Sequence, residues 1–334
     1  MTHVLVVGAG SVGRRHARNL VALGADASVV DPRADRRDEA ADGIPLRAAH
    51  ADLDAALGAG GHDAAVIASP TALHVPQALA ALAAGLPTLV EKPLAATLPD
   101  GTRLAAAADA PGAPPVLLGY TWRWWPALRH LRDRVRAGDV GEVRHLRCVL
   151  SAHLADWHPW ERYQDFFMAR TDLGGGALLD ESHWIDLAIW LLGTPDDVTA
   201  DVARISDLEI DTDDNVDLLL RFPSGARAWL HLDVHGRPHE RSVTVAGSTG
   251  TLRWSDAPDV VAHGTGADAW DARRFDDDRN DMFVAVATEL LDVVAGRSVP
   301  SCTVDDGLAA LRVVEAARRS SAEGRRVALG EVVA

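Results

Sequence analysis

The first 31 residues contain the feature that most restricts how this chain can fold. An apolar run at residues 3–7 leads into Gly8-Ala9-Gly10-Ser11-Val12-Gly13, and a helical stretch to Leu20 is followed by a second apolar run that ends in Asp31. A strand, a glycine turn, a helix and a second strand, in this order and within about 30 residues, are typical of the first βαβ unit of a doubly wound parallel sheet. The sequence therefore predicts an α/β N-terminal Rossmann domain.

Each glycine of this turn has a separate physical role in binding a dinucleotide. Gly8 permits the tight turn, Gly10 lets the backbone approach a pyrophosphate, and Gly13 lets the helix pack closely on the strand. Ser11 and Val12 begin the helix, whose N-terminus attracts phosphate groups. A purely structural glycine turn without a cofactor is the alternative interpretation.

The acid at the end of the second strand indicates which cofactor is bound. Asp31 follows Gly13 by eighteen residues, where a carboxylate accepts hydrogen bonds from the adenosine ribose. The same carboxylate repels a 2′-phosphate, so NAD is favoured over NADP. Arg33 and Arg36 follow closely, and arginine is the residue that accommodates a 2′-phosphate, so NADP stays possible.

Two further turns are predicted to share one edge of this sheet. Apolar strands at residues 63–68 and 87–90 end in Ser69-Pro70 and in Glu91-Lys92. Ligands of a parallel sheet bind at the carboxyl ends of its strands, so both turns are expected to lie at the cofactor. Predicted helices at 74–84 and 99–108 and a strand at 116–119 complete the domain.

Lys92 is the only lysine in the chain, because the other 32 of the 33 Lys and Arg residues are arginine. Arginine stays protonated in proteins, whereas the pKa of a lysine ammonium falls readily in a site of low dielectric constant. Only the ammonium is suited to polarise a C–O bond and share its proton. Lys92 is therefore a candidate catalytic residue, and an ordinary salt bridge is the alternative.

The second half of the chain changes from alternating elements to a run of strands. After a helix at 126–137 and a strand at 143–152, apolar or alternating runs follow at 198–205, 216–222, 226–234, 242–246 and 251–254, and helices return at about 279–295 and 305–323. Many strands with few helices between them predict an α+β domain with an open, largely antiparallel sheet. We place the domain boundary between residues 120 and 121, giving domains of residues 1–120 and 121–334.

The stretch 174–193 contains the candidate acid/base residue. If it is helical from about Ala177, Asp180, His183 and Asp186 lie on one face of an otherwise apolar helix. Histidine exchanges its proton near pH 7, and a neighbouring carboxylate fixes its tautomer. His183 is therefore the candidate acid/base residue. The alternative is a core histidine, with Asp180 stabilising the helix N-terminus.

Aromatic residues indicate a carbohydrate-like substrate. Seven of the ten tryptophans lie between residues 122 and 190. Indole faces stack on the apolar face of a sugar ring, and adjacent polar groups bind its hydroxyls. The candidate substrate-binding residues are Trp122, Arg123, Asp156, Trp157 and His158. His153, Asp156 and His158 would alternatively suit a metal ion, but no cysteine or third fixed element accompanies them, so no metal is predicted.

These motifs together resemble those of one known family. In chain order they are Gly8-x-Gly10-x-x-Gly13, Ser69-Pro70 with His74, Glu91-Lys92-Pro93, Tyr120-x-x-Arg123-Trp124-x-Pro126, the stretch 138–143, the glycines 174–176 and the stretch 247–252. Over most of its length the chain resembles the glucose-fructose oxidoreductase / inositol dehydrogenase / rhizopine catabolism family of NAD(P)-dependent oxidoreductases.

The resemblance implies roles that the residues alone leave open. It implies that His74 belongs to the cofactor site, that His183 is the catalytic histidine with Asp180 as its accompanying acid, and that the C-terminal sheet builds homodimers or homotetramers. Many members separate the acid and the histidine by four positions with a glycine between them. Here the spacing is three, and Glu181-Ser182 intervene.

Composition argues against several other classes of protein. A net charge of −15 disfavours nucleic acid or an anionic membrane as a partner. No apolar run approaches the length of a membrane span, no signal peptide is evident, and two distant cysteines suit a reducing compartment. A cytoplasmic protein is expected.

The sequence thus predicts an NAD(P)-dependent oxidoreductase acting on a secondary alcohol or ketone of a sugar, nucleotide sugar or cyclitol. Lys92 would polarise the reacting oxygen, and His183 would exchange its proton. Two alternatives stay open. One is an enzyme that retains NAD and uses transient oxidation for epimerisation or glycoside cleavage, and the other is a non-catalytic NAD-sensing regulator.

Overall fold

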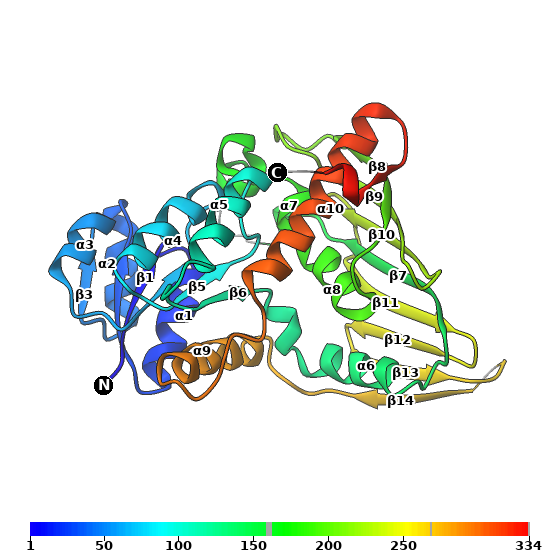
Figure 1. Cartoon of the computed structure of the whole chain (residues 1–334), viewed down its shortest axis with the longest axis horizontal. Coiled ribbons are helices and arrows are strands. Elements are labelled where there is room, and N and C mark those ends of the chain that lie inside the picture. The colour runs from blue at the N-terminus through cyan, green and yellow to red at the C-terminus, as the bar shows by residue number, and fades with distance from the viewer. Residues whose placement is uncertain (158–161, 268, 333–334) are drawn as a thin grey trace. The chain divides into compact units, whose positions relative to one another are not determined.

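The computed structural model describes residues 1–157, 162–267 and 269–332 and divides the chain into two compact units (Figure 1). The first unit comprises Met1–Trp124 and Arg279–Leu308, and the second comprises Trp125–Asp278 and Ala309–Ala334. The boundary predicted from the sequence assigns residues 279–308 to the second domain, whereas the structure joins them to the first. The first unit, which contains the predicted cofactor turns, is therefore formed by two segments that are far apart in sequence.

The first unit is built on a parallel sheet, as predicted. Within the described residues, its six strands follow the order β3-β2-β1-β4-β5-β6 and all pair in parallel. Strands β1, β4, β5 and β6 are buried at every position, which agrees with their continuous apolar sequences. The strands are β1 (His3–Val7), β2 (Asp26–Val30), β3 (Ala48–His50), β4 (Ala64–Ile67), β5 (Thr88–Glu91) and β6 (Val116–Gly119).

The helices of this unit connect successive strands, and one arrives from the distant segment. The connecting helices are α1 (Ser11–Ala22), α2 (Ala34–Gly43), α3 (Leu53–Ala59), α4 (His74–Ala83) and α5 (Leu98–Ala108), with short 3₁₀ helices at Thr71–Leu73 and Thr121–Trp124. Helix α9 (Asp281–Val294) packs against α1, where the side-chain amides of Asn19 and Asn280 exchange hydrogen bonds of 3.1 and 2.9 Å.

The strand order places three turns at one edge of this sheet. Strand β1 lies between β2 and β4, so the connections leave in opposite directions at its carboxyl end. The carboxyl ends of β1, β4 and β5 lead into Gly8, Ser69 and Lys92. Since parallel strands end at the same edge of a sheet, all three candidate cofactor turns belong to this edge.

The second unit is built on a mixed, largely antiparallel sheet, which also confirms the prediction. Its order in the described residues is β14-β13-β12-β11-β7-β10-β9-β8-β15, and β7 and β10 form its one parallel pair. The strands are β7 (Val143–Ser151), β8 (Asp197–Ala203), β9 (Asn215–Arg221), β10 (Arg227–Asp233), β11 (Glu240–Gly247), β12 (Thr251–Asp256), β13 (Asp259–Gly264), β14 (Trp270–Arg274) and β15 (Val327–Ala328).

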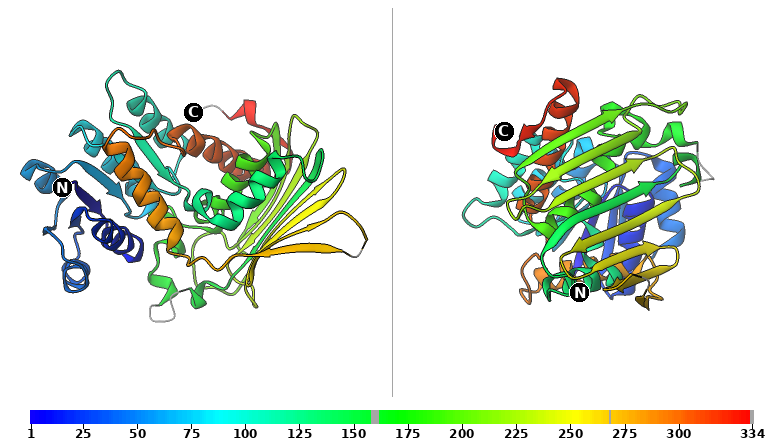
Figure 2. Two further views of the ribbon diagram at one scale, coloured as in Figure 1. Left: turned by 90° about the horizontal axis from the view of Figure 1, so that it is seen from below. Right: turned by 90° about the vertical axis from the view of Figure 1, so that its right-hand side faces the viewer.

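One face of this sheet is covered by helices, and the other is open. Along β10, Leu230 and Leu232 are fully buried, whereas Trp229 and His231 point to the opposite face and are half-buried. Helices α7 and α8 pack against β10, and α6 packs against β12 and β13. The open face is seen in the right-hand view of Figure 2. The helices are α6 (Pro126–Arg136), α7 (Ala177–Asp180), α8 (Ser182–Leu192) and α10 (Val304–Glu323), with 3₁₀ helices at Leu154–Asp156, Tyr163–Asp165, Phe167–Ala169, Thr171–Leu173 and Leu329–Glu331.

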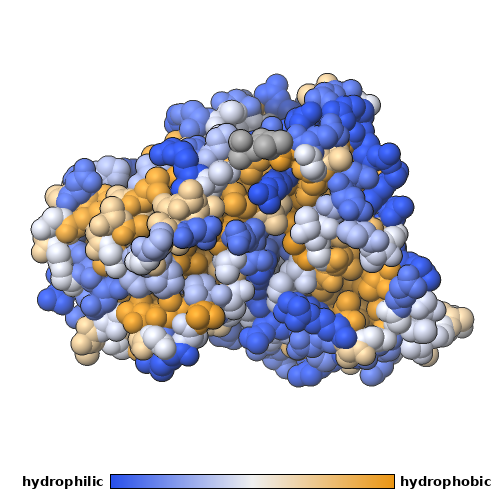
Figure 3. All heavy atoms as spheres, viewed as in Figure 1, coloured by the Kyte–Doolittle hydropathy of each residue, from blue (hydrophilic) through white to orange (hydrophobic). Residues whose placement is uncertain are grey.

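Hydrophilic and hydrophobic residues are interspersed on the side of the surface drawn in Figure 3. In the described part of the chain, none of the helices combines the length and the apolar character that crossing a membrane requires.

Candidate active site

The glycine turn after β1 has the geometry that a pyrophosphate requires. Gly8 has a φ of +96°, and a Cβ atom there would lie 2.6 Å from the carbonyl oxygen of Ala68. A Cβ atom at Gly13 would lie 1.8 Å from the carbonyl oxygen of Gly8. At Gly10, by contrast, nothing is closer than the guanidinium of Arg36 at 3.7 Å. Two glycines thus permit close packing, and the third leaves backbone open at the start of α1, which fits a dinucleotide.

Asp31 is buried at the end of β2 and is bonded to this turn. Its Oδ2 accepts a hydrogen bond from the Ala9 N–H at 2.9 Å, and its Oδ1 accepts one from the Arg33 N–H at 2.9 Å. Each carboxylate oxygen has a second acceptor position, so ribose hydroxyls can still be bound. The guanidinium of Arg33 pairs with Asp35, and this interaction lowers the pKa of Asp35 to about 2. The guanidinium of Arg36 lies 3.9 Å from the Asp31 carboxylate, and that of Arg37 donates to the Asp31 backbone carbonyl at 2.7 Å.

His74 connects the second and third turns of the same edge. Its Nδ1 lies 2.8 Å from the carbonyl oxygen of Pro93, and its Nε2 lies 2.9 Å from that of Ser69. Burial lowers the pKa of His74, so the ring is neutral at pH 7 and donates to one of these carbonyls at a time. The Ser69 hydroxyl in turn lies 2.5 Å from Oε1 of Gln77. The structure therefore places His74 between the turns, where it fixes their spacing.

Glu91 anchors the backbone of Lys92. Its Oε2 accepts the Lys92 N–H at 3.2 Å, and its Oε1 lies 2.7 Å from Nε2 of the fully buried His16 on α1. Gly119 leaves room for this side chain, because a Cβ atom there would lie 3.1 Å from the Glu91 carboxyl carbon. Lys92 itself is half-buried and precedes Pro93 through a cis peptide bond. Glu91 thus fixes the backbone of Lys92, the candidate catalytic residue.

The motif after β6 is buried within the first unit. Trp122 is 7% exposed and Arg123 is 8% exposed. The Arg123 guanidinium lies 3.0 Å from a carboxylate oxygen of Asp306. The positive charge of Arg123 is therefore balanced by the carboxylate of Asp306.

The predicted single helix around His183 is wrong. Helix α7 ends at Asp180 and α8 begins at Ser182, while Glu181 between them has φ −88° and ψ 18°. The N–H of Trp184 donates to the carbonyl of Glu181, three residues back, so the chain makes a tighter turn here. Asp180 and His183 consequently do not share one continuous helical face, whereas His183 and Asp186 both lie on α8. Asp180 is buried and His183 is half-buried.

Asp156 and Trp157 are held by their own unit. The Asp156 carboxylate accepts two hydrogen bonds from Arg237, at 2.6 and 2.7 Å, and these bonds lower the pKa of Asp156. The indole N–H of Trp157 donates to the Ala152 carbonyl at 3.1 Å. His158 lies outside the described residues. Among the residues that are described, no group of three or more His, Cys, Asp or Glu side chains could hold a metal ion.

Several other tryptophans of the predicted aromatic cluster have structural roles. The indole N–H groups of Trp125 and Trp254 donate to the two oxygens of Asp259, both at 2.8 Å. Trp184 is fully buried near Trp254. Trp190, which the sequence suggests as plain core, is half-buried, with the guanidinium of Arg132 lying over its ring.

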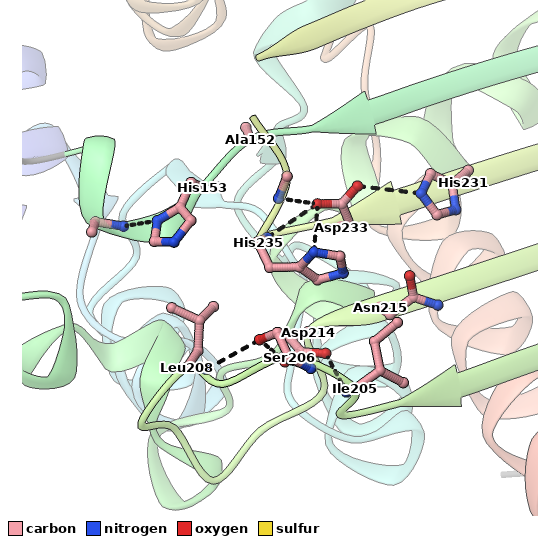
Figure 4. Close-up of polar contacts among 12 residues, drawn as sticks. Ala152, His153, Ile205, Ser206, Leu208, Asp214, Asn215, His231, Asp233 and His235 are labelled. Carbon is pink, nitrogen blue, oxygen red and sulfur yellow. Dashed lines mark hydrogen bonds and ion pairs between the residues drawn. The ribbon is translucent and has the colours of Figure 1, made fainter. Parts of the chain in front are cut away.

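The structure also reveals a polar cluster that the sequence analysis missed, at the end of β10 (Figure 4). The buried Asp233 accepts bonds from the N–H groups of His235 and Gly236 at 3.1 and 2.6 Å, and His231 Nε2 lies 3.2 Å from its carboxylate. The other ring nitrogen of His231 lies 2.9 Å from Asp217. The alternation of β10 gives a partial signal, because His231 and Asp233 alternate with the apolar residues Leu230 and Leu232.

Comparison with known proteins now defines the class. The family model described as "Oxidoreductase family, NAD-binding Rossmann fold" matches residues 2–120, and the "GFO/IDH/MocA C-terminal domain" matches residues 128–253. The chain belongs to this oxidoreductase family, and its first unit is an NAD-binding Rossmann domain. The family expected from the sequence motifs is therefore confirmed.

Individual relatives agree with this assignment. The chain is 31% identical over 336 residues to the myo-inositol dehydrogenase Hyg17 of Streptomyces leeuwenhoekii, covering 96% of this chain and 98% of that protein. It is 35% identical over 193 residues to an inositol 2-dehydrogenase of Leifsonia xyli, a match that spans 57% of this chain and about half (53%) of that protein.

A solved structure supports the full-length fold. GenD2 from gentamicin A biosynthesis, in complex with NAD, superimposes with a TM-score of 0.84 at 28% identity and covers 98% of this chain and 96% of that one.

Proposed function

We propose that this protein is an NAD-dependent dehydrogenase that oxidises a CH–OH group of a cyclitol or sugar and catalyses the reverse reduction. The observation that carries the proposal is the placement of the chain's only lysine. Lys92 follows β5 at the same sheet edge as the glycine turn, and Glu91 and His74 fix its turn. The names of the inositol dehydrogenases that the chain resembles support a cyclitol as the first substrate to test.

The described residues of the cofactor edge suit NAD. Gly8, Gly10 and Gly13 with the start of α1 at Ser11 and Val12 would hold the pyrophosphate, Asp31 the ribose, and the turns at Ser69-Pro70 and Glu91-Lys92 the nicotinamide end. When bound, NAD supplies the hydride acceptor of the reaction.

Lys92 and His183 would act on the hydroxyl that is oxidised. The Lys92 ammonium donates a hydrogen bond to the substrate oxygen and stabilises negative charge as it develops there. His183 accepts the hydroxyl proton and returns it in the reduction. Asp180 remains the accompanying acid in this proposal, acting from the neighbouring helical turn and not from the same helix.

The ion pairs of the candidate substrate-binding residues favour a neutral polyol as the substrate. Arg123 is paired with Asp306, and Asp156 is paired with Arg237. Paired groups still offer hydrogen bonds to hydroxyls, but they give little net attraction to a charged ligand. Trp122, Trp157 and His158 complete the proposed set of substrate contacts.

The variant Lys92→Arg tests the proposal most directly. We expect kcat for myo-inositol oxidation, followed by NADH absorbance, to fall by at least ~100-fold, because a guanidinium cannot share its proton. His183→Ala should cause a comparable loss, of the order seen when a general base is removed. Arg103→Lys, on the exposed face of α5, is the control and should leave the rate unchanged. Near-normal activity of Lys92→Arg would refute the catalytic role.

The substrate screen also separates the alternatives. Sugars and cyclitols are incubated with NAD, and both NADH release and product formation are measured. Product without NADH release would favour an enzyme that retains its cofactor, and NAD binding without any turnover would favour a regulator.

We further propose that the open face of the C-terminal sheet pairs with a second copy of the chain. Three neighbouring cross-strand rows on this face differ in character. The first contains Arg227, Arg221 and Asp197, the second contains Trp229, Leu219 and Thr199, and the third contains His231, Asp217 and Asp201; the rows follow from the strand register. A two-fold axis parallel to the sheet and running along the middle row would set the arginine-containing row of one copy over the aspartate-containing row of the other.

A further inference from the structure

Residues 211–214, Asp-Thr-Asp-Asp, precede β9 and bind a different segment through each side chain. We name this stretch the acidic bracket. Asp211 accepts the Thr171 N–H at 2.7 Å, Thr212 donates to the Met168 carbonyl at 2.9 Å, Asp213 accepts the Leu178 N–H at 2.7 Å, and Asp214 accepts the Ile205 N–H at 2.8 Å. The bracket therefore ties the segment before and within α7 to the sheet.

Asp213 supplies both contacts at the N-terminus of α7. Its side chain accepts the Leu178 N–H, and its backbone carbonyl accepts the Ala177 N–H at 3.0 Å. These are two of the donors that a helix leaves without intrahelical partners. Because α7 is a single turn, it has too few internal bonds to fix its own position. The position of α7 thus depends on the hydrogen bonds that Asp213 accepts from Ala177 and Leu178.

Gly176 shows how closely the bracket approaches this turn. It has a φ of +113°, and a Cβ atom there would lie 2.4 Å from Oδ1 of Asp213. A side chain at this position would displace the Asp213 carboxylate. The glycine before α7 is therefore required by the contact as well as by its own backbone conformation.

Asp213 is itself held rigidly by the next residue. The Asp214 carboxylate accepts bonds from the N–H groups of Ile205 and Ser206 and from the Ser206 hydroxyl, as Figure 4 shows for part of this cluster. Its carbonyl accepts the Val234 N–H at 3.0 Å. Strand β9 then continues between β8 and β10 within the sheet. The bracket is thus a fixed point from which α7 is positioned.

From α7, a short run of backbone bonds leads to His183. The N–H of Asp180 donates to Gly176 at 2.9 Å, that of Glu181 to Ala177 at 3.0 Å, and that of Trp184 to Glu181 at 3.0 Å. A displacement of the first turn would pass to the start of α8. We propose that Asp213 is a positioning residue that fixes His183 for proton exchange with the substrate. This inference rests on the proposed catalytic role of His183.

The negative charge of Asp213 is not what the contact needs. Burial raises the pKa of Asp213, so ionisation is disfavoured at this position. An amide oxygen in the same place would accept the Leu178 N–H equally well. Asp213→Asn should consequently preserve the function of the residue, whereas Asp213→Ala should remove it.

The experiment compares Asp213→Ala with Asp213→Asn in the full chain, with Asp211→Ala as the matched control from the same bracket. Backbone hydrogen exchange is measured by mass spectrometry on peptides covering residues 176–186. Kinetics use the polyol that gives most NADH in the screen, beginning with myo-inositol. Nucleotide affinity is measured by titration with NADH.

We expect Asp213→Ala to speed exchange in residues 176–186 and to lower kcat by roughly 10- to 100-fold, because a small misplacement of a catalytic group has an effect of this size. The NADH dissociation constant should stay unchanged. Asp213→Asn and Asp211→Ala should retain both kcat and the slow exchange of these residues. Gly176→Ala, which displaces the carboxylate, should reproduce the defect and replaces Asp213→Ala if that variant does not fold.

A kcat within twofold of wild type in folded Asp213→Ala or Gly176→Ala would overturn the inference. Loss of kcat in Asp213→Asn equal to that in Asp213→Ala would also overturn it, because the acceptor oxygen would then not be the active feature. The variant His183→Ala distinguishes a failure of the proposed function from a failure of the positioning role. Full activity of His183→Ala would refute the proposed function itself, whereas an inactive His183→Ala beside an active Asp213→Ala would refute only the positioning role.

Discussion

At the scale of single residues, we propose that Asp31 determines which nucleotide the cofactor edge accepts. Its carboxylate is buried and is bonded to the N–H groups of Ala9 and Arg33. A 2′-phosphate would bring a second negative charge to the same place. The guanidinium of Arg36 lies 3.9 Å from the carboxylate, and that of Arg37 is bonded to the backbone carbonyl of Asp31 at 2.7 Å. We therefore propose that the Asp31 carboxylate favours NAD over NADP.

The variant Asp31→Asn is expected to weaken this preference. The amide keeps the size of the side chain and an acceptor for the Ala9 N–H, but it removes the charge that repels a 2′-phosphate. We expect the ratio of NADPH to NADH affinity to rise by about 10-fold, the size of one charge-assisted hydrogen bond. Fluorescence titration with both nucleotides measures the ratio. Asp35→Asn, on the exposed side of the same turn, is the control, and an unchanged ratio in Asp31→Asn would contradict the assignment.

At the scale of elements, His231 joins β10 to β9 through an ionic contact. The pKa of His231 is raised to about 9, and the largest cause is its hydrogen bond to Asp233. Asp217 on the other side of the ring also raises this pKa, whereas burial lowers it. Burial opposes the charge of Asp233, yet bonds from His231, Ser151 and the N–H groups of His235 and Gly236 lower the pKa of Asp233 to about 2. The imidazolium between two carboxylates therefore stabilises the folded unit.

This contact predicts a stability that depends on pH. The pKa of His231 is raised above its ordinary value of 6.5, so its contribution is complete below pH ~6.5 and is lost as the pH rises through about 9. We expect His231→Gln to lower the free energy of unfolding by roughly 2 kcal/mol at pH 6 and to have little effect at pH 10. Urea unfolding followed by tryptophan fluorescence at both pH values measures this.

The control is His145→Gln, an exposed histidine of β7 whose pKa is lowered by burial and by Arg147. It should not show a larger loss at pH 6 than at pH 10. Equal destabilisation by His231→Gln at the two pH values would show that packing, and not charge, is responsible.

The elements differ in how far the sequence could predict them. Parallel strands buried on both faces, such as β1, show as apolar runs, and the glycine turn marks the cofactor edge, so the Rossmann unit followed from local patterns. The break between α7 and α8 did not, because Glu181 and Ser182 carry no glycine or proline to signal it. The start of α7 is held by Asp213, which lies 35 positions beyond Leu178 in the chain, and no periodicity of the sequence indicates such a contact.

The candidate site shows the same division between local and distant causes. Lys92 and Asp31 could be found because strand ends have recognisable sequences. The sequence suggested Arg123 and Asp156 as substrate-binding residues but not their ionic partners, which are Asp306 and Arg237 in the structure. Those partners lie 183 and 81 residues away in the chain, so only the tertiary structure identifies them.

At the scale of the whole molecule, we propose that assembly depends on the open face of the C-terminal sheet. Isologous pairing requires a patch that is complementary to itself. The strand register gives a row with Arg227 and Arg221, a middle row with Trp229 and Leu219, and a row with Asp217 and Asp201 beside His231. Leu219 lies in the middle row and is 37% exposed. A single exposed leucine is ordinary in a monomer, so the exposure of Leu219 is significant only because of its position between the charged rows.

Leu219→Arg is therefore expected to prevent pairing. Near the two-fold axis, each copy would bring its new guanidinium close to that of the other, and two like charges would be desolvated without a partner. Light scattering after size-exclusion chromatography should give a dimer or tetramer for the wild type and a monomer for the variant at the same concentration. Val299→Arg, which places the same charge at a residue that is 81% exposed in the first unit, should leave the assembly intact. A monomeric wild type, or a Leu219→Arg variant that still assembles, would refute pairing through this face, and restored assembly at high salt would identify charge repulsion as the cause.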